Sequence, residues 1–119
     1  MKTTIFDLLH ENAHLDNDLL FKKDKLGDDF SVIRDVDFAF KTVEKERADD
    51  LAEFVNGKNF GRATVSGDAE LYWVIVILSM PITQHVLCSI SGFMVCLSRL
   101  LGVEYDGWGS VTANSGLIK

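Results

Sequence analysis

Hydrophobic and polar residues follow two different periods along the chain, and these periods predict where strands and helices lie. From residue 30 to 41 apolar and polar residues alternate one by one, which is typical of a strand with one face in water. From about residue 44 to 56 the apolar residues recur every three or four positions, which is the spacing of one helix face. Residues 60–66 and 70–80 are predicted strands joined by a turn at Gly67-Asp68, and the second is rich in β-branched and aromatic residues.

The second half of the chain is predicted to hold one long helix and a last strand. Pro81 ends the preceding strand, Thr83 can cap the helix, and the helix runs to about Leu101. A strand is predicted over residues 103–112. The expected core stripe of the helix is Val86, Ile90, Phe93, Met94, Leu97, Leu100 and Leu101.

The N-terminal residues are predicted to form a separate lead-in. Residues 1–13 have the pattern of a short amphipathic helix, and the mostly charged residues 14–29 favour a loop or a frayed second helix. After this lead-in the order strand, helix, strand, strand, helix, strand predicts an α+β, ferredoxin-like sandwich. We expect a four-stranded antiparallel sheet with two helices on one face, an N-terminal helical extension (1–29), a domain over residues 30–112 and a C-terminal tail (113–119).

The other face of this sheet is expected to need a cover. Both alternating sets of side chains in the strand 70–80 are apolar, so the strand has no wet face. An exposed apolar patch of this kind is typical of an interaction site. The N-terminal helix, a second subunit in a homodimer, or a partner protein are the candidates for covering it.

The charge of the chain disfavours some partners. The formal net charge is -6, and an acidic protein is repelled by phosphate backbones, so we expect no direct contact with nucleic acid. Residues 71–98 carry no Asp, Glu, Lys or Arg, but Pro81, Gln84 and His85 break the stretch into apolar runs too short to span a membrane. The N-terminal sequence has no signal peptide, and we therefore expect a cytoplasmic protein that does not enter a membrane.

The sequence offers little for catalysis. It contains no phosphate-binding loop, no Cys-x-x-Cys, no His-Glu-x-x-His and no Gly-x-Ser-x-Gly. His10 and His14 have helical spacing but no further metal ligands, and His85 has no nucleophile beside it. We expect no enzyme activity, no metal and no cofactor. A hydrolase or metal enzyme built on His85 and strand carboxylates is the weaker alternative.

Two groups of residues are the candidates for binding a partner. Tyr105, Asp106 and Trp108 stand together near the C-terminus, and the glycines on either side of Trp108 suggest a bulge or a close backbone approach. Tyr and Trp are frequent hot spots of protein interfaces. Asp35 and Asp37 project from one side of the first strand and offer carboxylates to Lys and Arg of a partner. The first and last strands are expected to be neighbours, so the five residues form one patch if their side chains share a face.

The segment Leu101-Gly102-Val103-Glu104-Tyr105-Asp106-Gly107-Trp108-Gly109 resembles the ending of the family called regulator of ribonuclease E activity B. The resemblance continues through Gly27-Asp28-Asp29, Arg34-Asp35-Val36-Asp37-Phe38 and the helix around residues 48–55, and it covers residues 27–112. It implies a non-enzymatic α+β protein that binds ribonuclease E and restrains RNA processing by protein–protein contact. The alternative from the residues alone is a ferredoxin-like module that binds a small molecule or effector on its open sheet face.

Overall fold

A computed structural model describes residues 3–113 as three helices and four strands. The helices are α1 (Ile5–Lys25), α2 (Lys45–Gly57) and α3 (Gln84–Leu101). The strands are β1 (Arg34–Thr42), β2 (Arg62–Asp68), β3 (Leu71–Met80) and β4 (Glu104–Gly109). After α1 the order is β-α-β-β-α-β, which confirms the predicted α+β fold.

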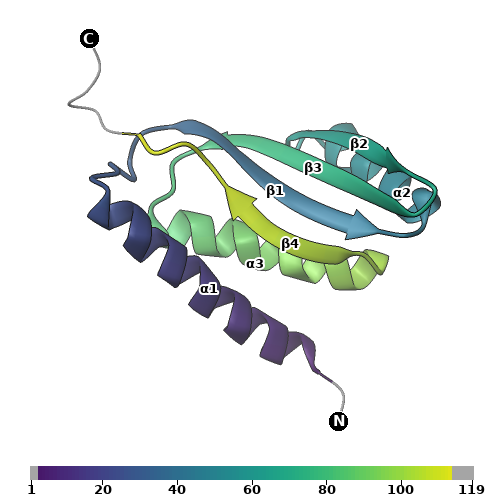
Figure 1. Cartoon of the computed structure of the whole chain (residues 1–119), viewed down its shortest axis with the longest axis horizontal. Coiled ribbons are helices and arrows are strands. Elements are labelled where there is room, and N and C mark those ends of the chain that lie inside the picture. The colour runs from purple at the N-terminus through teal and green to yellow at the C-terminus, as the bar shows by residue number, and fades with distance from the viewer. Residues whose placement is uncertain (1–2, 114–119) are drawn as a thin grey trace.

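The four strands form one antiparallel sheet in the order β2-β3-β1-β4. Helices α2 and α3 lie side by side against one face, α2 under β2 and β3 and α3 under β1 and β4 (Figure 1). Helix α1 packs against α3 on the same side of the sheet. Within residues 3–113, therefore, no helix covers the opposite face, and the N-terminal helix is not the cover considered above.

The core lies between the sheet and its helices. In β1 the side chains of Val36, Phe38 and Phe40 are completely buried and pair in register with β3, where Val74 and Val76 are buried as well. Strand alternation places all five on the helix side. Each fully buried Val or Phe contributes roughly 1.5–3 kcal/mol to folding, so this layer fixes which face of the sheet points inward.

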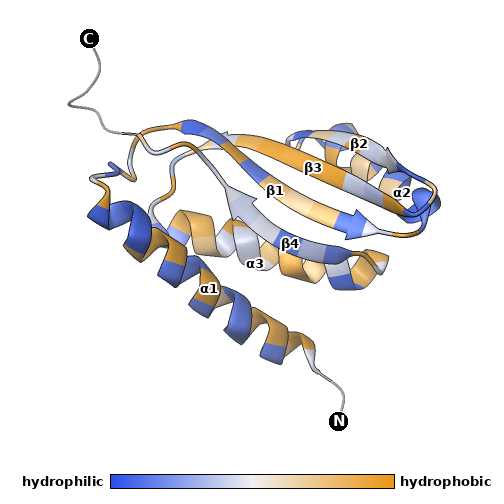
Figure 2. Ribbon diagram, viewed as in Figure 1, coloured by the Kyte–Doolittle hydropathy of each residue, from blue (hydrophilic) through white to orange (hydrophobic). Residues whose placement is uncertain are grey.

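Strand β3 is hydrophobic along nearly its whole length, as Figure 2 shows. Its second set of side chains, which includes Trp73, Ile75 and Ile77, lies on the open face and is only partly buried. The hairpin before it turns at Ala69 and Glu70, two residues later than predicted, because β2 continues through Gly67 and Asp68.

Helix α1 is longer than the sequence pattern predicted. Thr4 and Asp7 form a reciprocal capping box, with Asp7 N donating to Thr4 Oγ1 at 3.0 Å and Thr4 N donating to Asp7 Oδ2 at 3.1 Å. The helix then continues to Lys25, so the predicted loop or frayed helix over residues 14–29 is wrong for most of its length. The reason is tertiary, since buried polar residues of this segment bond to α3 and β4 and support a helix that has few apolar residues of its own.

Helix α3 confirms the long helix after Pro81 but not its whole core stripe. Met94 and Leu97 are buried, whereas Phe93 and Leu100 are 40% and 83% exposed. The buried positions also include Leu87, Ser91, Val95 and Ser98. Two serines are buried because α3 is covered on two sides, by the sheet and by α1, and a polar side chain can be satisfied between them.

Among the described residues, α3 has the length and hydropathy of a helix that could cross a membrane. Its two buried serines are hydrogen-bonded inside the protein, Ser91 to α1 and β4 and Ser98 to the carbonyl of Val95 at 2.7 Å. A core helix of a globular protein passes the same test of length and composition. The compact fold around α3 is that of a soluble globule.

The end of the chain is only partly described. Strand β4 stops at Gly109, three residues short of the predicted end of the last strand, and the chain is described to residue 113. The predicted tail of residues 113–119 therefore lies, except for Ala113, outside the described residues. The division between an N-terminal extension (1–29) and a domain that begins at residue 30 stays a prediction.

Candidate functional site

A β-bulge decides which way the side chains of β4 point. Opposite β1, Tyr105 pairs with Phe40 and Trp108 pairs with Phe38, with a register shift between them. Asp106 is the extra residue, and the next residue, Gly107, has a φ of 103° that favours glycine. Without the bulge Tyr105 and Trp108 would face opposite sides of the sheet, but with it both point toward the helices. The bulge suggested by the two glycines is confirmed.

The inward side chains of β4 join a polar network with α1 and α3. Ser91 Oγ lies 3.0 Å from the Tyr105 hydroxyl and donates to Asp16 Oδ1 at 3.2 Å. Trp108 Nε1 donates to the same carboxylate oxygen at 3.0 Å. Asn12 Nδ2 donates to Ser91 Oγ at 2.9 Å and to Asp16 Oδ2 at 3.2 Å. Asp16 is thus the point at which α1, α3 and β4 meet.

Burial changes the pKa values of two groups in this network, the Asp16 carboxyl and the Tyr105 phenol. Desolvation raises the pKa of the Asp16 carboxyl above its ordinary value of 3.8, while the hydrogen bonds from Ser91 and Trp108 oppose the rise. Desolvation also raises the pKa of the Tyr105 phenol, so this side chain stays neutral and acts as a hydrogen-bonding group. Asp16 has no local signal in the sequence, because nothing in the helical pattern distinguishes it from the exposed acids around it.

The carboxylates of the candidate patch lie on the open face of the sheet. Asp35, Asp37 and Asp106 are all exposed. Asp35 Oδ2 lies 3.3 Å from Arg62 Nη2 of β2. Asp37 makes no ion pair within the described part of the chain, and its Oδ1 lies beside Gly109 of β4.

Lys41 lies between Asp106 and a further acid on this face, Glu104. Its ammonium lies 3.5 Å from Glu104 Oε2 and 3.5 Å from Asp106 Oδ1, and 5.6 Å from the centre of the Trp73 ring. Asp106, followed by Glu104, raises the pKa of the Lys41 ammonium. The open face therefore combines an apolar strip on β3 with a rim on β1 and β4 in which acids outnumber bases.

The structure divides the five candidate residues between two faces. Asp35, Asp37 and Asp106 all lie on the open side, on β1 and β4. Tyr105 and Trp108 lie on the helix side, where their polar atoms bond to Ser91 and Asp16. The condition for a single patch, that all five side chains share a face, is not met.

A second polar cluster lies where the sheet meets the end of α1. Arg34 Nη1 lies 2.8 Å from the buried Asp28 Oδ2, and Lys23 Nζ lies 3.8 Å from the same oxygen. Arg34 also donates to the carbonyl of Val111 at 3.2 Å, and Lys23 donates to the carbonyl of Ser110 at 2.9 Å. These bonds fix the segment that follows β4 against the end of α1. The ion pair between Arg34 and Asp28, six residues earlier in the chain, was not predicted from the sequence.

The three histidines lie at the surface and belong to no metal-binding cluster among residues 3–113. His10, His14 and His85 are exposed, and no group of three or more His, Cys, Asp or Glu side chains in this range is placed to hold a metal ion. His14 Nε2 lies 3.8 Å from Asp18 of its own helix. The carboxylates Asp35 and Asp37 lie on the sheet face that α3 does not cover, so they are not brought together with His85.

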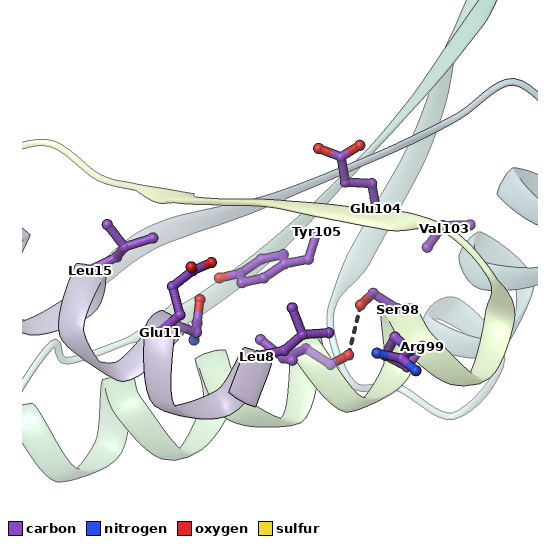
Figure 3. A pocket seen from close by; sticks show the side chains of 10 residues that line it. Leu8, Glu11, Leu15, Ser98, Arg99, Val103, Glu104 and Tyr105 are labelled. Atoms are coloured by element: carbon purple, nitrogen blue, oxygen red, sulfur yellow. Dashed lines mark hydrogen bonds between the residues drawn. The ribbon is translucent and has the colours of Figure 1, made fainter. Parts of the chain in front are cut away.

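Two adjoining cavities lie between α1 and β4. One, of 310 Å³, is bounded by α1, the C-terminal half of α3 and the start of β4, with Leu8, Glu11 and Tyr105 in its wall (Figure 3). The other, of 350 Å³, continues along β4 to Trp108. Together they form a groove between α1 and the outer edge of β4, which we call the β4 groove.

The fold and these surfaces define a small α+β binding protein with an acidic open sheet face and a groove along one sheet edge. A family model described as regulator of ribonuclease activity B matches residues 13–110. The chain belongs to this RraB family. Membership implies a non-enzymatic regulator of ribonuclease E activity. No individual curated protein matches the chain.

Proposed function

We propose that this protein binds ribonuclease E directly, in the cytoplasm, and restrains RNA processing by contact with the enzyme rather than with RNA. The observation that carries this proposal is the family match over residues 13–110, which includes every strand of the sheet. The net charge of -6 supports a protein partner, since an acidic surface repels RNA and attracts Lys and Arg.

The open sheet face is the surface that we propose for this contact. The exposed carboxylates of Asp35, Asp37 and Asp106, on β1 and β4, lie along one side of an apolar strip on β3 that includes Trp73 and Ile75. An apolar centre with a charged rim is the usual anatomy of a protein interface. The acidic rim attracts a basic partner toward this face, and the apolar strip is the surface that the partner buries on binding.

Tyr105 and Trp108 remain predicted contacts, but of a different kind. They line the β4 groove, so a partner touches them from the side of α1 and not from the open face. In this proposal they also hold α1 in place through Asp16 and Ser91.

Capture of purified ribonuclease E on the immobilised protein tests the proposal. We expect capture by the wild type and at least a tenfold loss of affinity for Asp35→Lys/Asp37→Lys. The matched control is Asp50→Lys/Glu53→Lys, which makes the same charge change on the exposed face of α2. We also expect the wild type, and not the first variant, to slow cleavage of an RNA substrate by the enzyme.

Each outcome bears on a separate part of the proposal. If folded wild type neither captures the enzyme nor slows cleavage, direct binding is wrong. If the two charge variants lose binding equally, attraction by net charge explains the result and the open face is not the contact surface.

A further inference from the structure

Strand β4 is an edge strand that lies beside an open groove. Its ladder partner is β1, and among residues 3–113 no group bonds to the outer backbone edge of Glu104–Gly109. The walls of the β4 groove include every residue from 103 to 108. Unpaired backbone groups at such an edge are a template for another strand.

The other edge of the sheet is closed at one position. The side-chain amide of Asn56 in α2 pairs with both backbone groups of Ala63 in β2, accepting from its N–H at 2.9 Å and donating to its carbonyl at 3.0 Å. This amide occupies the place that a further strand would take. The two edges therefore differ, and β4 is the edge left available.

The wall of the groove opposite β4 carries three leucines of α1, together with the polar residues Glu11, Asn12 and Asp16. Leu8, Leu15 and Leu19 of α1 line it, and Leu15 is 59% exposed although it faces the body of the protein. In Figure 3 Leu8 and Leu15 face Tyr105 across the groove, whereas Glu104 points away from it. One side of β4 thus offers apolar surface and the other side offers carboxylates.

We propose that β4 binds an extended segment of the partner protein as a fifth strand, and that residues of this segment alternate between basic and apolar. In an added strand, side chains point alternately to the two faces of the sheet. On the open face they meet Glu104 and Asp106, two carboxylates that share the single ammonium of Lys41 and so keep a net negative charge that favours Lys or Arg. On the helix side they enter the β4 groove and cover Leu8 and Leu15. This inference rests on the proposed function, because it takes the segment to belong to ribonuclease E.

Charge argues against a second copy of this chain as the occupant. Two β4 edges paired with each other would bring Glu104 and Asp106 of one copy beside the same acids of the other. Like charges on neighbouring strands are destabilising. Glu11 at the wall of the groove adds a further acid, and among the described residues Arg99 is the one base in the groove wall. The bulge at Asp106 twists the edge, so we expect a short added strand.

A labelled eight-residue peptide of alternating lysine and valine is the probe for this site. We expect fluorescence anisotropy to show binding to the full-length protein, and hydrogen exchange to slow at the β4 amides and not at those of β2. Leu15→Lys should weaken binding at least tenfold. The matched control Leu100→Lys replaces a leucine that is 83% exposed and outside the groove, and it should bind as the wild type does. A peptide with the same residues in two blocks should bind at least tenfold more weakly.

Several results would overturn the proposal. One is that Leu15→Lys and Leu100→Lys bind the peptide equally well. Another is that the peptide slows hydrogen exchange at the β2 amides or at no amides. A third is that the protein forms a dimer in which the β4 amides exchange slowly without peptide. Capture of ribonuclease E that Leu15→Lys leaves unchanged would overturn strand addition and leave the proposed function standing. Binding of the alternating peptide at β4, without any capture of ribonuclease E, would support the site and overturn the proposed function.

Discussion

At the scale of single residues, Asp16 is the side chain that joins α1 to both α3 and β4 by hydrogen bonds. It is 3% exposed, yet it lies on a helix whose neighbouring positions are mostly in water. A buried carboxylate is tolerated when its oxygens accept hydrogen bonds, and Asp16 accepts from Ser91, Trp108 and Asn12. The aromatic residues of β4 are thus tied to the N-terminal helix through one acid.

Asp16 should give the stability of the protein a characteristic pH dependence. Its pKa is raised in the folded state, so above about pH 4 the folded protein binds more protons at this site than the unfolded chain does. The contribution of Asp16 is fully present below its unfolded pKa and is lost as pH rises through its folded pKa. We expect Asp16→Asn, which keeps an acceptor for Ser91 and Trp108, to lack this decline.

Urea unfolding at a series of pH values from about 4 to 7 measures the effect. The difference in unfolding free energy between wild type and Asp16→Asn should shift steadily in favour of the variant as pH rises. Asp18→Asn, on the exposed side of the same helix, is the control. Parallel pH profiles for wild type and Asp16→Asn would contradict the prediction.

At the scale of elements, the sequence predicted correctly those strands and helices in which the hydrophobic residues keep a regular strand or helix spacing. Strand β1 and helix α2 were correct to within a few residues, because alternation and helical spacing there coincide with the buried face. Helix α1 was missed beyond residue 13, since two of its three buried residues, Asp16 and Lys23, are charged, and only contacts with distant elements make them interior. Contacts with distant elements also explain why α3 buries Ser91 and Ser98, whereas Phe93 and Leu100 were predicted to be buried.

The candidate site was predictable in composition but not in geometry. The two glycines around Trp108 indicated a bulge, and the bulge was found. Sequence alternation alone, however, does not reveal that one extra residue turns Tyr105 and Trp108 to the same side. The face of each side chain depends on the register with β1, which is a property of the assembled sheet.

The side-chain amide of Asn56 should stabilise the edge strand β2 and keep it from pairing with other molecules. Asn56→Ala leaves the N–H and the carbonyl of Ala63 without their described partners and opens the edge. We expect a loss of about 1–3 kcal/mol in unfolding free energy and a greater tendency to self-associate. Urea unfolding and sedimentation velocity measure the two effects.

Lys58→Ala, at an exposed position just after the same helix, is the control and should change neither quantity by much. If Asn56→Ala unfolds like the wild type and stays monomeric, the amide does not protect the edge.

At the scale of the whole molecule, charge and shape are divided between the two sides of the sheet. The helix side is packed, and the polar atoms of Asp16, Ser91, Tyr105 and Trp108 in its interior are hydrogen-bonded to one another. The open side carries an apolar strip with an acidic rim and is not covered within the described residues. On the same face, this protein of 119 residues and net charge -6 thus has carboxylates that attract a basic partner and an apolar surface that binds it.

This division predicts how salt should affect binding to ribonuclease E. Electrostatic steering acts on the encounter of two proteins, so raising the salt from about 0.05 to 0.5 M should lower the association rate constant roughly tenfold or more. The dissociation rate should change much less, because apolar contacts on β3 and in the β4 groove are not screened by ions. Surface plasmon resonance with the enzyme immobilised measures both rates. Asp35→Lys/Asp37→Lys should associate slowly at every salt concentration and show a flatter dependence. A salt effect confined to the dissociation rate would mean that buried ion pairs, and not steering by the open face, govern the interaction.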